Sequence, residues 1–320
     1  MIQQHSPRIS VAMATHNGER FLRKQLDSLF RQSRLPDEVV VSDDASTDGT
    51  VQLLQTYSEL HPLRVETHAV NIGVNANFFH ALACTTGEWI CICDQDDIWL
   101  PEKIETLGRV MQKMDQARPA AVSSSRIDVN ADGEKTGEHR QKYTSGWKAT
   151  LLTLDRSQGC TMMINRRLLE RALYWYNNSE WADKVMYDVL LSVVAAVEGE
   201  KINLPDPLML YRHHDRNVVD RAQEKKPTFA QHIRTMRTYY PFLIDYRISE
   251  LSMMSRMYGP AKEGNEEALR FMQQMQALDA AAGIREGLGI VIRLKSIGIG
   301  TRILTAICTP AVKAAKRIIK

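Results

Sequence analysis

The order of apolar runs and helical periodicities along the first half of the chain predicts alternating strands and helices. Short apolar runs bounded by polar turns are typical of buried strands, and they occupy Ile9–Ala14, Glu38–Ser42, Arg64–His68 and Trp89–Cys93. Apolar residues three and four positions apart predict helices over Glu19–Gln32, Gly49–Leu60, Asn77–Cys84 and Pro101–Gln116. Strands that alternate with helices form a parallel sheet covered on both faces, so this half is predicted to be an α/β domain.

The second half of the chain is less regular. We expect a strand, a helix and a second short strand in the middle of the chain, over Thr161–Asn165, Lys184–Val197 and Leu208–Arg212. Asp128–Gly137 reads as a turn-rich connection. From about Ala222 the pattern is helical to the end. The chain therefore divides into an α/β domain of residues 1–220 and a helical region of residues 221–320.

Three carboxylates follow the last predicted strand of the first half. Asp94, Asp96 and Asp97 come directly after the apolar run Trp89–Cys93. Like charges this close raise one another's pKa unless a cation neutralises them. Oxygen ligands on a short loop suit Mg²⁺ or Mn²⁺, which is often shared with a substrate phosphate. The alternative is an acidic turn in which Asp97 caps the helix that begins near Pro101.

Polar side chains also follow the first two predicted strands, and ligands of open α/β sheets bind at the carboxyl ends of strands. The carboxylate of Asp44 can accept a hydrogen bond from a nucleobase N–H or a ribose hydroxyl. Thr15 and Asn17, after the first strand, can line a nucleotide pocket. The alternative for both segments is a turn that caps the next helix, and Asp48-Gly49 is a good turn dipeptide.

Three further residues combine polar chemistry or conformational freedom with a suitable position. Gly159 precedes a predicted strand, where a glycine lets the backbone approach a ligand, although a bulge or tight turn is the alternative. Asp188 begins an apolar predicted helix, whose N-terminus stabilises a carboxylate. The alternative is that Asp188 only stabilises the helix start and takes no part in a reaction. His214 can ligate a metal or contact phosphate, whereas we expect His213 to lie in a solvated loop.

Composition excludes several classes of protein. The 320 residues are 44% hydrophobic and 25% charged, as in soluble globular chains. There is no apolar run of about 18 residues, so we expect no membrane-spanning helix. The polar N-terminus does not resemble a signal peptide. Five cysteines without a C-x-x-C pair indicate a reducing cytoplasm, and they argue against structural zinc or a disulfide framework.

The C-terminal tail differs from the rest of the chain in charge. The formal net charge is +3, yet residues 283–320 hold eight Lys or Arg residues and a single acid. A cationic stretch that also contains Ile, Leu and Val suits the surface of an anionic membrane. The alternative is that the tail packs on the α/β domain or forms a contact between copies of the chain. The basic residues are not interleaved with aromatic residues, which argues against nucleic-acid binding.

Six segments occur in order along the chain: A-T-H-N-G at 14–18, S-D-D-A-S-T-D-G-T at 42–50, N-I-G-V-N-A-N-F at 71–78, C-D-Q-D-D-I-W-L-P at 93–101, Q-G-C-T-M-M-I-N at 158–165 and Y-R-H-H-D-R-N-V-V at 211–219. Together they resemble the inverting family-2 glycosyltransferases with a GT-A fold, in particular a bacterial rhamnosyltransferase-like branch. The resemblance covers about residues 8–220. It implies an α/β fold with a Rossmann-like, mostly parallel central sheet flanked by helices, followed by an α-helical C-terminal extension.

The resemblance implies roles for single residues. Asp44 is expected at the nucleobase and Asp94 at the donor ribose, while Asp188 falls where the family places its general base. The full donor-binding set is expected to be Thr15, Asn17, Asp44, Asp94, Gln95 and Gly159. The expected metal-binding set, with its histidine close to the metal or diphosphate, is Asp96, Asp97 and His214. Relatives usually read His-Asp-Trp-Trp around the base, and this chain has Tyr187-Asp188-Val189-Leu190, which leaves the acceptor open.

The function that the resemblance implies is an inverting transfer of a sugar, dependent on Mn²⁺ or Mg²⁺, from a nucleoside-diphosphate donor to a glycan hydroxyl in bacterial surface-polysaccharide synthesis. The expected donor is dTDP-rhamnose, and the alternative is a UDP-sugar carrying a hexose or N-acetylhexosamine. A lipid-linked acceptor would agree with a cytoplasmic protein at the inner face of the membrane.

Functions from other classes compete with sugar transfer. A glycoside hydrolase would use Asp94 and Asp188 as a carboxylate pair and would need no nucleotide. A nucleotidyltransferase usually carries a G-x-x-x-x-G-K-[ST] loop, which this sequence lacks. A non-catalytic sugar-nucleotide binder is the remaining alternative. Nucleotide binding separates the hydrolase from the other classes.

Overall fold

The structure is a computed structural model, and it describes residues 6–140, 143–145, 158–178 and 185–215, together with residues 266, 267, 270 and 273. The strands are β1 (Ile9–Thr15), β2 (Glu38–Asp43), β3 (Leu63–Thr67), β4 (Trp89–Cys93), β5 (Ile98–Trp99), β6 (Ala120–Val129), β7 (Lys135–His139), β8 (Thr144–Ser145), β9 (Met162–Asn165) and β10 (Glu200–Arg212). The helices are α1 (Glu19–Leu29), α2 (Thr50–Ser58), α3 (Val74–Ala83), α4 (Lys103–Met111), α6 (Arg166–Asn178) and α7 (Tyr187–Glu198), and Gly159–Thr161 form a 3₁₀ turn, η1.

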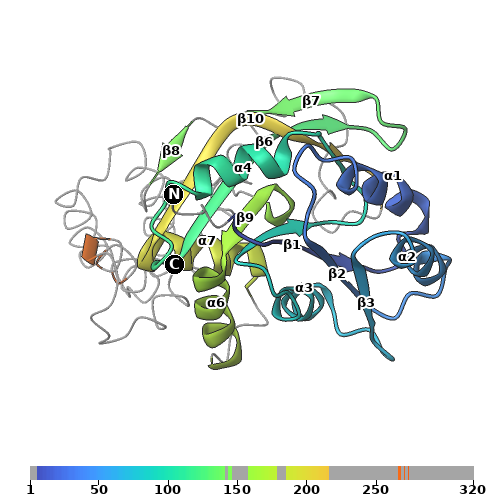
Figure 1. Cartoon of the computed structure of the whole chain (residues 1–320), viewed down its shortest axis with the longest axis horizontal. Helices are drawn as coiled ribbons and strands as arrows, with labels where there is room; N and C mark the ends of the chain where they lie inside the picture. Colours follow the sequence, from blue (N-terminus) through green and yellow to red (C-terminus); the bar gives the residue numbers. More distant parts are fainter. Residues whose placement is uncertain are drawn as a thin grey trace, which may run out of the picture. The chain divides into compact units, whose positions relative to one another are not determined.

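The strands form one curled sheet with helices on both faces (Figure 1). Its order is β3-β2-β1-β4-β9-β6-β10-β5, with β7 paired to β6 and β8 to β10. Strand β1 pairs in parallel with both β2 and β4, and β2 pairs in parallel with β3. Strand β9 lies antiparallel between β4 and β6. The carboxyl ends of β1, β2 and β4 therefore meet at the same edge, which is where an α/β sheet binds its ligand.

The central strands are apolar throughout because both of their faces are covered. Val11 and Met13 of β1 belong to a buried cluster with Leu22 of α1 and Ile104 of α4. Ala12, between them, points to the opposite face, where α3 and α6 lie (Figure 1). All three of these β1 residues are fully buried. A strand buried on both faces reads as a continuous apolar run, and this explains why the sequence pattern predicted these strands.

The second half of the domain contains more structure than the sequence predicted. The connection predicted at Asp128–Gly137 is a hairpin, because β6 runs to Val129, turns through Gly133 with φ of 95°, and pairs with β7. The strand predicted at Leu208–Arg212 is the end of a strand of 13 residues. A proline has no backbone N–H to donate to a neighbouring strand, so Pro207 argues against a continuous strand in the sequence. In the structure β10 continues through Pro207 because its pairing register with β6 shifts on either side of it. The sequence pattern had predicted no element at helix α6.

The basic tail, residues 283–320, lies outside the described residues. Of the region 221–320, the structure describes residues 266, 267, 270 and 273 alone, so the predicted helical extension and its membrane or oligomer contact stay predictions. Among the residues that the structure does describe, no helix combines the length and the apolar character that crossing a bilayer requires.

Glu38 ties three segments together at the sheet edge opposite the polar loops. Its Oε1 accepts hydrogen bonds from the Ser10 hydroxyl at 2.6 Å, the Thr86 amide at 2.6 Å and the Thr86 hydroxyl at 2.8 Å. Burial alone would raise the pKa of Glu38, but these hydrogen bonds and the charge of Arg8 lower it below its ordinary value. The carboxylate therefore stabilises the fold above its unfolded pKa, and this contribution is lost as the pH falls through the folded pKa.

We expect Glu38→Gln to lower the free energy of unfolding by about 1–2 kcal/mol near neutral pH, because charge-assisted hydrogen bonds become neutral ones. The difference between variant and wild type should shrink as the pH falls below the ordinary carboxylate range, where wild-type Glu38 is itself protonated. Urea denaturation of both proteins across this pH range measures it. A difference that stays constant with pH would contradict the role of the charge.

Candidate active site

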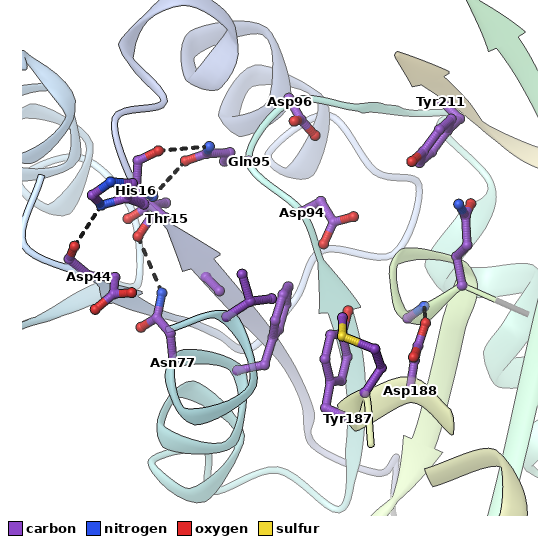
Figure 2. Close-up of a pocket in the computed structure, with 16 residues that line it drawn as sticks. Thr15, His16, Asp44, Asn77, Asp94, Gln95, Asp96, Tyr187, Asp188 and Tyr211 are labelled. Carbon is purple, nitrogen blue, oxygen red and sulfur yellow. Dashed lines mark hydrogen bonds between the residues drawn. The ribbon is translucent and has the colours of Figure 1, made fainter. Parts of the chain in front are cut away.

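A pocket of about 240 Å³ opens at the carboxyl ends of β1, β2 and β4 (Figure 2). The start of α3, the turn η1, the start of α7 and the end of β10 complete its wall. The lining residues are Ala14, Thr15, His16, Asp44, Val74, Asn77, Phe78, Asp94, Gln95, Asp96, Gln158, Gly159, Met186, Tyr187, Asp188 and Tyr211. Thr15, Asp44, Asp94 and Asp188 belong to one compact unit of the chain.

Thr15 and Asn17 tie the loop after β1 to the loop after β2. The Thr15 hydroxyl donates to Asp43 at 2.7 Å, and the Asn17 side-chain oxygen accepts the Thr47 amide at 2.8 Å. Asn17 has φ of 48°, a left-handed conformation that asparagine tolerates better than most residues. Thr15 lines the pocket as predicted, whereas Asn17 lines a neighbouring pocket of about 510 Å³. Both residues therefore also do the structural work of a turn.

Asp44 connects the end of β2 to the loop before α3. Its Oδ1 accepts the Ile72 amide at 2.6 Å and its Oδ2 accepts the Gly73 amide at 3.0 Å. Asp44 is almost fully buried and still lines the pocket. Gly73 takes up φ of 88°, a conformation that favours glycine. The predicted nucleobase contact is thus an acid that also shapes the β3–α3 loop.

The three acids after β4 separate into two environments. Asp94 and Asp96 line the pocket, but Asp97 is fully buried and does not line it, and its Oδ1 accepts the Arg212 amide at 3.1 Å. Gln95 and Asp96 form a bend between β4 and β5, and Asp94, Gln95 and Asp96 all line the pocket, so the separation does not follow the alternation of a strand. The structure therefore does not bring Asp97 to the pocket wall beside Asp96, where the metal prediction placed it. Asp97 Oδ2 has no hydrogen-bond partner among the described residues.

Burial and mutual repulsion raise the pKa values of two acids of the cluster. Burial, together with the negative charge of Asp96, raises the pKa of Asp94 to about 7. Burial and the charges of Asp96 and Asp94 raise the pKa of Asp97 well above its ordinary value. A positive ion at the pocket would remove much of this repulsion.

His214 and Gln95 lie beside the acids, while their predicted roles in metal and donor binding stay predictions. The His214 Nε2 is 2.8 Å from Asp96 Oδ2, and its ring packs 4.7 Å from the ring of Phe21. Gln95 accepts the His16 amide at 2.9 Å and donates to the His16 carbonyl at 3.1 Å (Figure 2). Gln95 and His16 line both pockets, so this pair forms the partition between them.

Carboxylate oxygens and an imidazole nitrogen are ligand types that suit Mn²⁺ or Mg²⁺, but the ligand atoms of Asp94, Asp96 and His214 are not found gathered within 4.8 Å of one another in the described part of the chain. Asp94 and Asp96 present carboxylates at the pocket, and His214 is already paired with Asp96. The group that does gather among the described residues is Asp94, Asp97 and Cys160, whose ligand atoms lie within 4.8 Å of one another. The Cys160 thiol is fully buried and burial raises its pKa, and a protonated thiol does not suit these hard ions.

Asp188 faces the pocket from the first turn of α7. The Gly159 amide donates to its Oδ2 at 3.3 Å. Gly159 packs so closely on Tyr187 that a Cβ atom there would overlap the Tyr187 hydroxyl. The Tyr187 ring in turn stacks on Phe78, with ring centroids 4.0 Å apart. Gly159 is therefore needed because it packs against Tyr187. The alternative prediction for Gly159, a bulge or tight turn, covers the turn η1 but not this contact.

Sequence reasoning missed several residues of this pocket. Asn77 donates to the Thr15 carbonyl at 3.2 Å, and its side-chain oxygen has no partner within the described ranges. Tyr211 lines the pocket from the end of β10. Lys103, which sequence reasoning also missed, does not line the pocket: it is fully buried, donates to the Cys160 carbonyl and lies 3.9 Å from the Trp99 ring. Their motifs were visible, but only the paired strands show which side chains face the pocket.

Comparison with known sequences gives consistent matches. The sequence matches the family described as "Glycosyl transferase family 2" over residues 10–173. It is 27% identical over 220 residues to dTDP-rhamnosyl transferase RfbG of Shigella flexneri, covering 65% of this chain and 73% of that protein. It is 26% identical to an uncharacterised protein of Mycobacterium tuberculosis, covering 69% of this chain but only 63% of that relative's length.

Solved structures show the same fold at low identity. TarS 1–349 of S. aureus in complex with UDP-GlcNAc has a TM-score of 0.55 at 18% identity, covering 96% of this chain and 81% of that one. Mannosyltransferase PcManGT from Pyrobaculum calidifontis in complex with GDP-Man and Mn²⁺ has a TM-score of 0.50 at 20% identity, covering 97% and 88%. The GT-A fold expected from the sequence is thereby confirmed. Because the family match spans more than half of the chain, this protein belongs to glycosyl transferase family 2.

Proposed function

We propose that this protein is an inverting glycosyltransferase that moves a sugar from a nucleoside-diphosphate donor to a glycan hydroxyl. The observation that carries the proposal is the pocket that gathers Asp44, Asp94, Asp96 and Asp188 from segments far apart in the sequence. Asp44 lies toward one end of it and Asp188 toward the other, with Asp94 between them (Figure 2). A donor that lies along this line has its base near Asp44 and its reacting carbon near Asp188.

The reaction itself needs one proton acceptor at the sugar end of the pocket. We assign this role to Asp188, which takes the proton of the acceptor hydroxyl while that oxygen bonds to the anomeric carbon. The bond from that carbon to the donor's diphosphate breaks on the opposite face, and its electron pair leaves with the diphosphate. The anomeric configuration is therefore inverted. The Gly159 amide, 3.3 Å from the Asp188 carboxylate, holds it toward the pocket.

The metal proposal rests on Asp96 and His214, whose donor atoms suit Mn²⁺ or Mg²⁺, with Asp94, predicted at the donor ribose, in the same pocket as Asp96. When bound, such an ion offsets the negative charge that develops on the leaving diphosphate. Support comes from the Mn²⁺ in the PcManGT complex, which shares the fold.

The name of the Shigella relative supports dTDP-rhamnose as donor, and the UDP-GlcNAc complex of TarS supports a UDP-sugar as the alternative. The acceptor that fits both is a glycan of bacterial surface polysaccharide, such as O-antigen, capsule or cell wall, and a lipid-linked form would bring the protein to the cytoplasmic face of the membrane. In this proposal residues 1–220 catalyse and residues 221–320 contact the membrane or another copy of the chain.

The donor can be identified by thermal melting of the full chain with TDP, UDP, GDP or CDP, each with and without Mn²⁺ or Mg²⁺. A ligand that binds only the folded state raises the melting temperature. At a ligand concentration a hundredfold above Kd it adds about 2.7 kcal/mol to the free energy of unfolding. We expect a rise with TDP, or with UDP, that requires the metal. No rise with any nucleotide would contradict the transferase and favour a glycoside hydrolase.

A further inference from the structure

The segment N-I-G-V-N-A-N-F, residues 71–78, lies between the nucleotide end and the base end of the pocket. At its start, Asp44 holds the Ile72 and Gly73 amides. At its end, Phe78 stacks on the Tyr187 ring, next to Asp188. Between these points lies Asn75, which does not line the pocket and to which the proposed reaction assigns nothing. Its contacts show what it does.

Asn75 binds the chain just before α7 through both groups of its amide. Its Nδ2 donates to the Val185 carbonyl at 2.9 Å, and its Oδ1 accepts the Tyr187 amide at 2.9 Å. The two partners are two residues apart, on either side of Met186, which is extended with ψ of 142°. This is the hydrogen-bonding pattern of a neighbouring strand, made here by one side chain across about 110 residues of sequence.

Helix α7 depends on this contact because it has no side-chain cap of its own. The first amides of a helix have no partner inside the helix, and Ser, Thr, Asp or Asn usually supplies one from the preceding position. Here that position is Met186, which makes no side-chain cap hydrogen bond. Asn75 accepts the first helical amide, that of Tyr187, in its place. The helix therefore begins where α3 holds it.

Asp188 is the next residue, so the place where α7 begins also decides where its carboxylate lies. If the first turn frays, Asp188 loses its helical position and its contact with the Gly159 amide. A displacement of about 1 Å at a reacting group can cost about a hundredfold in rate. The donor end and the base end are thus joined by one continuous segment.

We propose that Asn75 is a positioning residue that fixes the first turn of α7 and thereby holds Asp188 in the pocket. This rests on the proposed role of Asp188 as base. Asn75 touches neither donor nor acceptor in this arrangement, because it lies outside the pocket lining. Its loss should therefore reduce the rate of the reaction and leave the binding of the nucleotide unchanged.

The first test is hydrogen exchange of the full-length wild type, Asn75→Ala and Asn75→Asp. Asn75→Ala should speed exchange of the α7 first-turn amides about fivefold, since a lost hydrogen bond is worth about 1 kcal/mol. Asn75→Asp keeps the acceptor for Tyr187 but loses the donor to Val185, so it should be intermediate. The control is Asn178→Ala, which removes an exposed amide that donates to the Tyr174 carbonyl within α6. Unchanged exchange in Asn75→Ala would overturn the proposal.

The second test is a double-mutant cycle on dTDP release from dTDP-rhamnose, combined with TDP and Mn²⁺ melting shifts. Asn75→Ala should lower the rate at saturating donor by about 10–100-fold without changing the shift. In an Asp188→Asn background it should lower the rate no further, because it acts through Asp188. If the rate losses of the two substitutions multiply in the double variant, or if Asn75→Ala loses the melting shift with TDP and Mn²⁺, Asn75 has only a general structural role. If Asp188→Asn alone is fully active, the proposed base fails, while the exchange result still decides whether Asn75 caps α7.

Discussion

Asp188→Asn is expected to slow sugar transfer by about 10²–10⁴-fold, because general-base catalysis contributes about that much and an amide cannot accept the proton. The substitution preserves size and keeps an oxygen for the Gly159 amide, so the pocket should persist. Nucleotide binding should be unchanged, because Asp188 lies at the end of the pocket away from Asp44 (Figure 2). The measurement is initial transfer rate alongside the metal-dependent melting shift.

The matched control for this prediction is Asp206→Asn, which removes an exposed carboxylate from β10, outside the pocket lining. It should transfer sugar at the wild-type rate. If Asp188→Asn retains more than about a tenth of wild-type activity with its melting temperature unchanged, another group must accept the proton. The assignment of Asp188 as base would then be wrong, although family membership would stand.

Asp96→Ala is expected to abolish the metal-dependent part of nucleotide binding. Asp96 lines the pocket and its Oδ2 lies 2.8 Å from His214, so its loss removes one ligand and the partner of a second. Loss of partners around a metal typically costs about 10–100-fold in affinity or activity. We therefore expect the extra melting shift with Mn²⁺ to disappear and the transfer rate to fall by at least that factor. Titration calorimetry of Mn²⁺ measures the loss directly.

Glu102→Gln serves as the control, since Glu102 is an exposed acid a few residues further along the chain and caps α4 without a side-chain hydrogen bond. It should bind Mn²⁺ and nucleotide as the wild type does. His214→Ala should weaken Mn²⁺ binding in the same direction as Asp96→Ala. An Asp96→Ala protein with the wild-type response to Mn²⁺ would show that the ion, if it binds, is held elsewhere.

The pocket could be predicted to the extent that strand ends are visible in the sequence. Thr15, Asp44 and Asp94 follow apolar runs, and parallel pairing brings the ends of those runs together. Asp188 and Gly159 required the resemblance, because nothing local distinguishes a helix-start acid or a turn glycine from a structural one. Their positions in the pocket agree with the predictions, while the roles assigned to them stay predictions.

The structure decided what each polar residue faces. Asp96 and Asp97 are neighbours of the same chemical type, yet one lines the pocket and the other is buried against the Arg212 amide. No sequence pattern marks that difference, because it depends on where β10 passes. Asn75 is similar: a polar residue in the first turn of a helix gives no sign that it will cap another helix about 110 residues away.

The sequence alone determined the alternation of strands and helices, and with it the parallel core. It also determined that acids follow the strands. These features depend on hydrophobic periodicity and on residues close together in the chain. Tertiary structure decided which of those acids share a pocket, which is buried, and which helix start is held by Asn75. Those outcomes depend on the pairing of segments far apart in sequence, and only the packed sheet brings such segments within hydrogen-bonding distance.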